Sequence, residues 1–246
     1  VHLVTALPGP DVSRRMLSGD VAGSMGAADV GRALETRLDV AHGSLRATLS
    51  GAFGQYDDLR AGGGERQVRT GFRTGGGAAR FRWNVRDDLV VDAAYLFSFL
   101  DDHERSDDLP KGDLRIYDNH DHLAYAKVRW HGAGSLRRIE AGLSWHRTRE
   151  NALRFSCRLP AHDSQAISAC AALNADRVQR QRRYLDTVDS PGGHVEAMLT
   201  GWDDRLLITT GGDVYLDLVS SGQWSGRADD DFVMTPAERG NYTDGS

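Results

Sequence analysis

Long apolar segments, proline and cysteine are all scarce in this sequence of 246 residues, with only 6 Pro and 2 Cys. No run approaches the ~18 consecutive apolar residues that a membrane-spanning helix needs. With 30 Lys and Arg against 35 Asp and Glu, the net charge of −5 gives no electrostatic basis for binding nucleic acid. Mean hydropathy is −0.47, which still allows a transmembrane β-barrel, because every second residue of its strands is polar.

Apolar and polar residues alternate over many segments. Between Leu45 and Phe53 the odd positions are apolar or Gly, while even positions include Arg46 and Thr48. A period of two with one apolar and one polar face is the signal of a β-strand with one face in water. Strands of an all-β fold are therefore predicted at 12–22, 30–41, 44–56, 67–83, 88–100, 122–131, 137–148, 194–202 and 205–217.

The connections between these strands alternate between very short and very long. Short polar joints lie at 84–87, 131–135 and 203–205, and long charged stretches lie at 57–67, 101–120, 149–193 and from 218 onward. A soluble sandwich has no reason to place its long loops at one end, whereas a transmembrane barrel has short periplasmic turns and long outer loops. The rhythm predicts an antiparallel meander of about nine strands belonging to a transmembrane β-barrel.

Aromatic residues gather near the ends of the predicted strands, many of which have the length of about nine to eleven residues that a tilted strand needs to cross a bilayer. One set, next to the short turns, is Trp83, Trp130 and Trp202, and a second set, next to the long loops, is Phe97, Phe99 and Trp145. Amphipathic rings gather in this way at the two interfaces of a membrane, whereas a soluble core would scatter them. We therefore predict two aromatic girdles.

One predicted strand breaks the alternation. Its apolar residues fall on even positions up to Phe72 and on odd positions from Ala79. Between them lie Gly75–Gly77, where a bulge would reset the facing of the strand at low steric cost. We expect one bent strand over 67–83.

The two cysteines, Cys157 and Cys170, lie in one long polar connection. If paired, they close a small loop, which requires an oxidising compartment. If the protein is cytosolic, they are two separate thiols. No CxxC spacing accompanies them, which argues against a zinc site.

Several short segments resemble parts of the barrel of TonB-dependent outer-membrane receptors. These segments are HLVTALP at 2–8, GQYDDLRAGGG at 54–64, DHLAYAKVRW at 121–130, LLITTGGDVYLDLVSS at 206–221 and RGNYTDGS at 239–246. The first is similar to the seam at which the plug domain ends, and the fourth to a later strand with a T-x-G-G/D-x-Y core. Together they identify the chain as similar to the N-terminal part of such a barrel.

The resemblance implies how the chain is organised and what it binds. Residues 1–11 would be the end of the plug or a linker, and 12–246 a partial barrel of a longer receptor that also has a plug and a TonB-contacting segment. The protein would be a monomer in the bacterial outer membrane, in contact with lipid, with the TonB complex and with a small extracellular ligand, most often a ferric siderophore. Loops 101–120 and 149–193 would contact that ligand first, with Cys157 and Cys170 bracing the second as a disulfide.

Few residues suggest chemistry of their own, and we expect no enzymatic activity and no cofactor. His120 and His122 would share one side of a strand and are weak candidates for a metal site, although a solvated loop edge explains them as well. The acidic runs 101–102, 107–108 and 229–231 lack the spacing of a calcium loop and are better explained as solvated charge. Ser144 and His146 share a polar strand face, but nothing marks Ser144 as an activated nucleophile.

The inward face of the predicted barrel is fixed by its charged residues, since each would cost about 2–4 kcal/mol at the lipid midplane. They are Arg46, Arg80, Arg82, Lys127, Arg129, Arg138 and Glu140. Two alternatives remain open. One is a complete small barrel, either a porin-like channel or an outer-membrane enzyme, and the other is a secreted soluble β-sheet module that binds a ligand.

Overall fold

The chain is almost entirely β-strand over residues 15–105, 107, 109–157, 170, 178–202, 205–227 and 235–236, which the structure, a computed structural model, describes. The strands are β1 (Met16–Met25), β2 (Arg32–His42), β3 (Leu45–Tyr56), β4 (Phe72–Arg86), β5 (Leu89–Arg105), β6 (Asp113–His131), β7 (Leu136–Cys157), β8 (Val178–Gly201), β9 (Leu206–Tyr215), β10 (Leu218–Arg227) and β11 (Thr235–Pro236). A 3₁₀ turn, η1 (Leu109–Lys111), precedes β6. Within these described ranges, none of the helical segments is long and apolar enough to cross a membrane.

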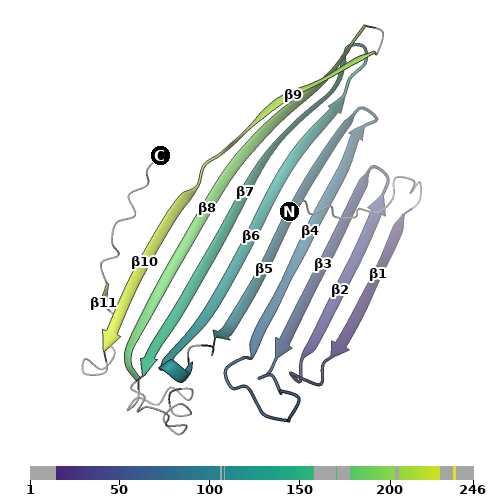
Figure 1. Ribbon diagram of the computed structural model, residues 1–246. Helices are drawn as coiled ribbons and strands as arrows, with labels where there is room; N and C mark the ends of the chain where they lie inside the picture. The colour runs from purple at the N-terminus through teal and green to yellow at the C-terminus, as the bar shows by residue number, and fades with distance from the viewer. Residues whose placement is uncertain are drawn as a thin grey trace.

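The strands form one antiparallel sheet in which neighbours in sequence are neighbours in space from β1 to β8 (Figure 1). β8 then pairs with both β9 and β10, each along one half of its length. The break between these two strands lies opposite Pro191, which has no N–H to give to the ladder. β9 and β10 therefore act as one interrupted strand, and the predicted all-β antiparallel meander is confirmed.

The two ends of the sheet carry connections of different length. Residues 43–44, 87–88, 132–135 and 202–205 join strands at one end, hereafter the turn end, and 26–31, 57–71, 106–112 and 158–177 join them at the other, the loop end. In Figure 1 the turn end is uppermost and the loop end lowermost. The predicted alternation of short and long connections is thus confirmed.

Pleating gives the sheet one apolar and one polar face, and the register keeps them in phase from strand to strand. Leu49 lies opposite Ala79 on the apolar face, and Arg82 lies opposite Asp92 on the polar face. The charged residues predicted to share a face all lie on the polar face: Arg46, Arg80, Arg82, Lys127, Arg129, Arg138 and Glu140. The strand periodicity read from the sequence was therefore sufficient to separate the faces.

The long loops predicted at 101–120, 149–193 and from 218 were largely wrong. β5 continues to Arg105 and β6 begins at Asp113, β7 and β8 extend into the second stretch, and β10 occupies the start of the third. These strand ends were predicted to be loops because they are rich in charged residues. Cross-strand ion pairs such as Arg154–Asp113, with an Nη2–Oδ2 distance of 2.6 Å, satisfy the charges within the ladder.

The bulge predicted at Gly75–Gly77 was also wrong. β4 begins at Phe72, pairs with β3 and β5 in unbroken register through the glycines, and shifts register only between Asn84 and Arg86. The glycines instead make room for rings on the apolar face, because a Cβ on Gly75 would lie 2.7 Å from the Phe99 ring and one on Gly77 2.8 Å from the Phe97 ring. Glycine in a strand is here a site of close approach.

No second layer covers the described sheet. The accessible surface is 16278 Å², whereas a compact protein of this mass exposes about 11,000 Å². Among described residues the apolar cluster is small and lies at the loop end, where Leu109, Leu114 and Cys170 pack against Phe155 and Cys157. Large apolar side chains are instead exposed along the apolar face, including Leu49, Leu143 and Val195. The apolar face therefore exposes large side chains that no described residue covers.

Candidate functional site

The polar face carries a belt of paired charges toward the turn end. Arg82 donates from Nε and Nη2 to the two carboxylate oxygens of Asp92, at 2.6 and 3.1 Å. The next register positions in the same row are Arg46 on β3 and Lys127 on β6. Asp92 and Arg46 are only 5% and 7% exposed, although no second layer covers them. Neighbouring long side chains on the same face therefore bury this row.

Glu140 on β7 contacts two cations and one imidazole of the belt. Its carboxylate lies 2.8 Å from Arg129, 3.5 Å from Lys127 and 3.4 Å from His194. Arg138 and Glu196 form a further ion pair on the same face. The predicted polar wall thus contains three groups of paired side chains over β4 to β8: Arg82–Asp92, Glu140 with its three neighbours, and Arg138–Glu196.

Beside the belt the polar face has a hollow of ≈ 480 Å³, lined by Tyr125, Lys127, Ser144, His146, Ser190, His194 and Tyr215 together with three apolar residues. Glycines shape it: a Cβ on Gly142 would lie 2.4 Å from His194, and a Cβ on Gly192 2.3 Å from Tyr215. These two side chains therefore lie across the neighbouring strand. The hollow presents imidazole, phenol and hydroxyl groups to whatever faces this wall, which makes it the candidate contact site of the polar face.

The aromatic residues predicted as girdles lie on two levels of the sheet. Trp83 is exposed beside the turn end of β4, Trp202 is exposed in the 202–205 turn, and Trp130 donates from Nε1 to Asp88 at 2.9 Å. Toward the loop end, ring contacts cross strands in two groups, Phe53–Phe99–His120 and Phe97–Tyr95–His122–Trp145; the two groups together are called the ring cluster. That the two levels are membrane girdles stays a prediction.

His120 and His122, the candidate metal ligands, both belong to the ring cluster. His120 Nε2 lies 3.0 Å from an oxygen of Asp101, and His122 Nδ1 lies 2.7 Å from the Tyr95 hydroxyl. Over the described residues no group of three or more His, Cys, Asp or Glu side chains could hold a metal ion. Both histidines thus have neighbours in the sheet, and the metal assignment stays untested.

The acidic runs that the structure describes are paired with cations. Asp102 pairs with Arg73, and Asp107 with Arg105 at 2.9 Å. Asp108 and the run 229–231 lie outside the described residues, as do the linker 1–11 and the motif at 239–246.

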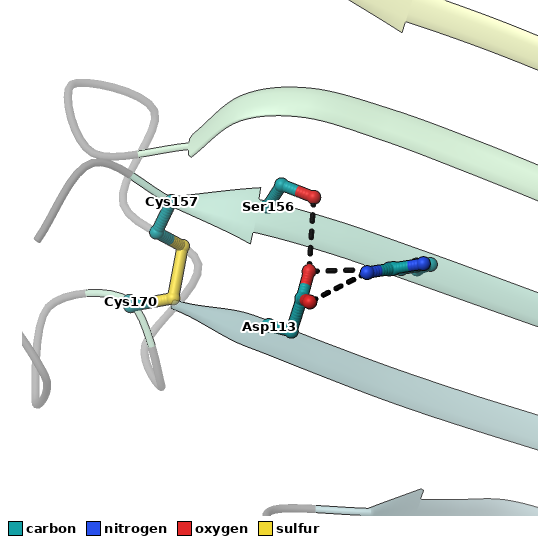
Figure 2. The surroundings of a disulfide bond; sticks show 5 residues. Asp113, Ser156, Cys157 and Cys170 are labelled. Atoms are coloured by element: carbon teal, nitrogen blue, oxygen red, sulfur yellow. Dashed lines mark hydrogen bonds and ion pairs between the residues drawn. A yellow bond between two sulfur atoms is a disulfide. The ribbon is translucent and has the colours of Figure 1, made fainter. Parts of the chain in front are cut away.

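Cys157 and Cys170 are joined by a disulfide at the loop end (Figure 2). The bond ties the end of β7 to the apolar cluster, in which Cys170 is fully buried. Of the connection that it closes, only Cys170 is described.

On the polar face beside the disulfide, Asp113 accepts hydrogen bonds from Arg154 and from the Ser156 hydroxyl, the latter at 3.0 Å (Figure 2). The hydrogen bonds from Arg154 hold the pKa of Asp113 below its ordinary value, against the opposing effect of burial. The sequence analysis missed this group, since it lay in a stretch read as loop.

The partners of the wall, Asp92, His194 and Glu196, lie in phase with the predicted wall residues, as the period of two along each strand predicts. Which residues would be opposite one another could not be read, because register depends on the turns.

No protein-family model matches the chain. No curated protein matches it either. Solved structures do. The copper transporter OprC superposes on 90% of this chain with a TM-score of 0.59 at 14% identity, and the match covers 31% of that structure.

Weaker matches are the siderophore receptor PiuA from Acinetobacter baumannii and the FrpB iron transporter from Neisseria meningitidis. Their TM-scores are 0.40 and 0.41, at 9% and 10% identity; they cover 86% and 87% of this chain, and 43% and 46% of those structures. The chain therefore spans less than half the length of each solved structure. The fold of the described part, an open antiparallel sheet, is similar to that of part of the OprC structure.

Proposed function

We propose that this chain is part of the barrel of an outer-membrane TonB-dependent transporter that imports a scarce extracellular ligand. The observation that carries the proposal is the separation of chemistry between the faces. Every strand from β3 to β8 places apolar residues on one face and charged residues on the other, with long connections at one end only. A lipid-facing surface and a wet interior require this arrangement.

Strand length supports the same assignment. β1 to β3 have 10 to 12 residues, which at ~3.4 Å per residue and a tilt of ~40° cover a hydrocarbon core of about 30 Å. β7 and β8 have 22 and 24 residues, twice that length. Their loop ends would extend beyond the outer leaflet, where the ligand arrives. Arg154 and Cys157 lie at the loop end of β7, beside Asp113 of β6.

The unpaired edges support a larger barrel. Among described strands β1 pairs only with β2, and β9 only with β8. Exposed strand edges are not tolerated in lipid, since their N–H and C=O groups have no water to bind. We propose that residues 12–246 form part of a monomeric barrel, that 1–11 link it to a plug, and that the polar wall meets that plug. TonB contact and ligand identity, with a ferric siderophore the leading candidate, belong to the same proposal.

The test uses the full-length protein expressed in a Gram-negative host. Membranes are separated, and the protein is run on gels with and without heating, because folded outer-membrane barrels migrate anomalously until heated. Uptake of radiolabelled ferric siderophore is then measured with and without functional TonB. We expect an outer-membrane protein that shifts on heating and supports uptake only when TonB is present.

Other outcomes identify the alternatives. A protein that purifies and refolds in water without detergent would be a soluble β-sheet module. A heat-modifiable protein whose transport is independent of TonB would be a porin-like channel. Both results would contradict the proposal, whereas TonB-dependent uptake of a different small ligand would correct only the ligand.

A further inference from the structure

A connected group of polar and aromatic side chains lies on the apolar face beside the ring cluster, where Arg147 pairs in register with His122. Arg147 on β7 donates from Nε and Nη2 to the two oxygens of Asp189 on β8, both at 2.8 Å. Its guanidinium carbon lies 5.4 Å from the centre of the Trp145 ring, and Trp145 Nε1 also donates to Asp189. The guanidinium is thus fixed in orientation while 46% of the Arg147 side chain stays exposed.

The next residue of β7 on this face is also an arginine. Arg149 is exposed and pairs in register with His120 and Thr187. Its side chain makes no hydrogen bond or ion pair within the described part of the chain. A guanidinium has five N–H donors, of which Asp189 takes two from Arg147. Two neighbouring arginines therefore present more donors than the surrounding carboxylates use.

Directly toward the turn end, the same face is hollowed. A groove of ≈ 700 Å³ runs over β5 to β9. Most of its lining is apolar or Gly, including Val128, Leu143, Val195 and Val214, and Lys127, His194 and Asp213 also line it. Small residues form its floor: a Cβ on Gly212 would meet nothing within 4 Å. Leu143 lies two residues from Trp145, so the groove begins where the arginine group ends.

We propose that Arg147, Arg149 and the Trp145 ring, together with this groove, form a binding site for one phosphorylated lipid of the outer leaflet. Paired arginines match the geometry of a phosphate, and their hydrogen bonds to it are charge-assisted. The groove is chiefly apolar and suits an acyl chain. A phospholipid or lipid A has its phosphate nearer the membrane surface than its acyl chains. Along β7 the arginines likewise lie closer to the loop end than the groove does. The inference rests on the proposed membrane location of the apolar face.

The experiment uses the full-length protein in phosphatidylcholine nanodiscs, with bisphosphorylated lipid A and its dephosphorylated counterpart as probes. Binding is measured by native mass spectrometry. We expect wild type to prefer the phosphorylated probe, and the double variant Arg147→Gln/Arg149→Gln to bind it about tenfold more weakly, the equivalent of one lost charge-assisted hydrogen bond. Gly212→Leu, which adds a side chain where a Cβ would meet nothing within 4 Å, should weaken binding of both probes.

A matched control is Arg86→Gln, which removes an exposed arginine at the turn end and should leave binding unchanged. Equal binding of the two probes by wild type would overturn the inference, as would an unchanged preference in the double variant or a groove occupied by a second copy of the chain. Heat modifiability and TonB-dependent uptake are recorded for every variant. If they fail in wild type the proposed function fails, whereas their persistence with no lipid preference removes only the lipid site.

Discussion

The two faces of this sheet are built from the same strands, yet they are held together differently. On the apolar face rings contact one another, as in the Tyr95–His122 and His122–Trp145 stacks at 6.1 and 6.4 Å, and the Arg147–Asp189 ion pair lies beside them. On the polar face the contacts are chiefly between charges, as in the Arg82–Asp92 and Arg129–Glu140 pairs. Because no second layer covers either face of the described sheet, the side chains of each face indicate the medium that the face contacts. The comparison predicts opposite responses to the same substitution.

The largest effect should come from placing a charge on each face in turn. Leu49 and Ser50 are neighbours in the middle of β3, on the apolar and polar face respectively, and both are exposed. Leu49→Arg should destabilise the folded protein in lipid vesicles by about 2–4 kcal/mol, since the charge would lie near the midplane. Ser50→Arg should change it little. The measurement is urea unfolding of the full-length protein in vesicles, and similar losses for both variants would show that the apolar face does not meet lipid.

A smaller and more local effect is expected at the loop end, where the apolar face holds the disulfide. Cys157→Ser/Cys170→Ser removes a cross-link between residues 13 apart. Loop-closure entropy for such a span is worth about 3 kcal/mol, so amide exchange of residues 109–117 should accelerate accordingly, while exchange at Val128 near the turn end stays unchanged. Ser156→Ala, which removes one hydrogen bond on the opposite face, is the control and should cost about 1 kcal/mol. Equal acceleration at both ends of β6 would contradict a local role.

The smallest effect is a pH dependence confined to the polar face of the same strand end. Arg154 lowers the pKa of Asp113 on folding, so this carboxylate adds stability above its unfolded pKa of about 3.9 and loses it as pH falls through the lower folded value. Protection of amides near Asp113 should therefore exceed that in Asp113→Asn at pH 6, and the two should converge at low pH. A wild-type–variant difference that persists unchanged at low pH would argue against an ionic origin. The disulfide contribution should not vary over this range.

Much of the site could be predicted from residue periodicity. The seven predicted wall residues share one face because alternation is local to each strand and needs no knowledge of neighbours. The strand ends at 101–105, 113–120 and 149–157 were misjudged because charge on both faces is typical of loops. Only the pairing of Arg154 with Asp113, from strands joined by a turn far away, makes such a sequence favourable as a strand.

The sequence by itself determined which residues face which way, where the short turns fall and that the chain is all-β, because each of these depends on near neighbours and on backbone pleating. Tertiary structure decided what depends on register. It set Arg147 beside Asp189, brought rings from β3, β5, β6 and β7 into contact across strands, and placed the Phe97 and Phe99 rings against the Gly75–Gly77 run, where no bulge forms. Register is a cooperative property of all turns and strands together, and a single residue of slip would exchange the two faces.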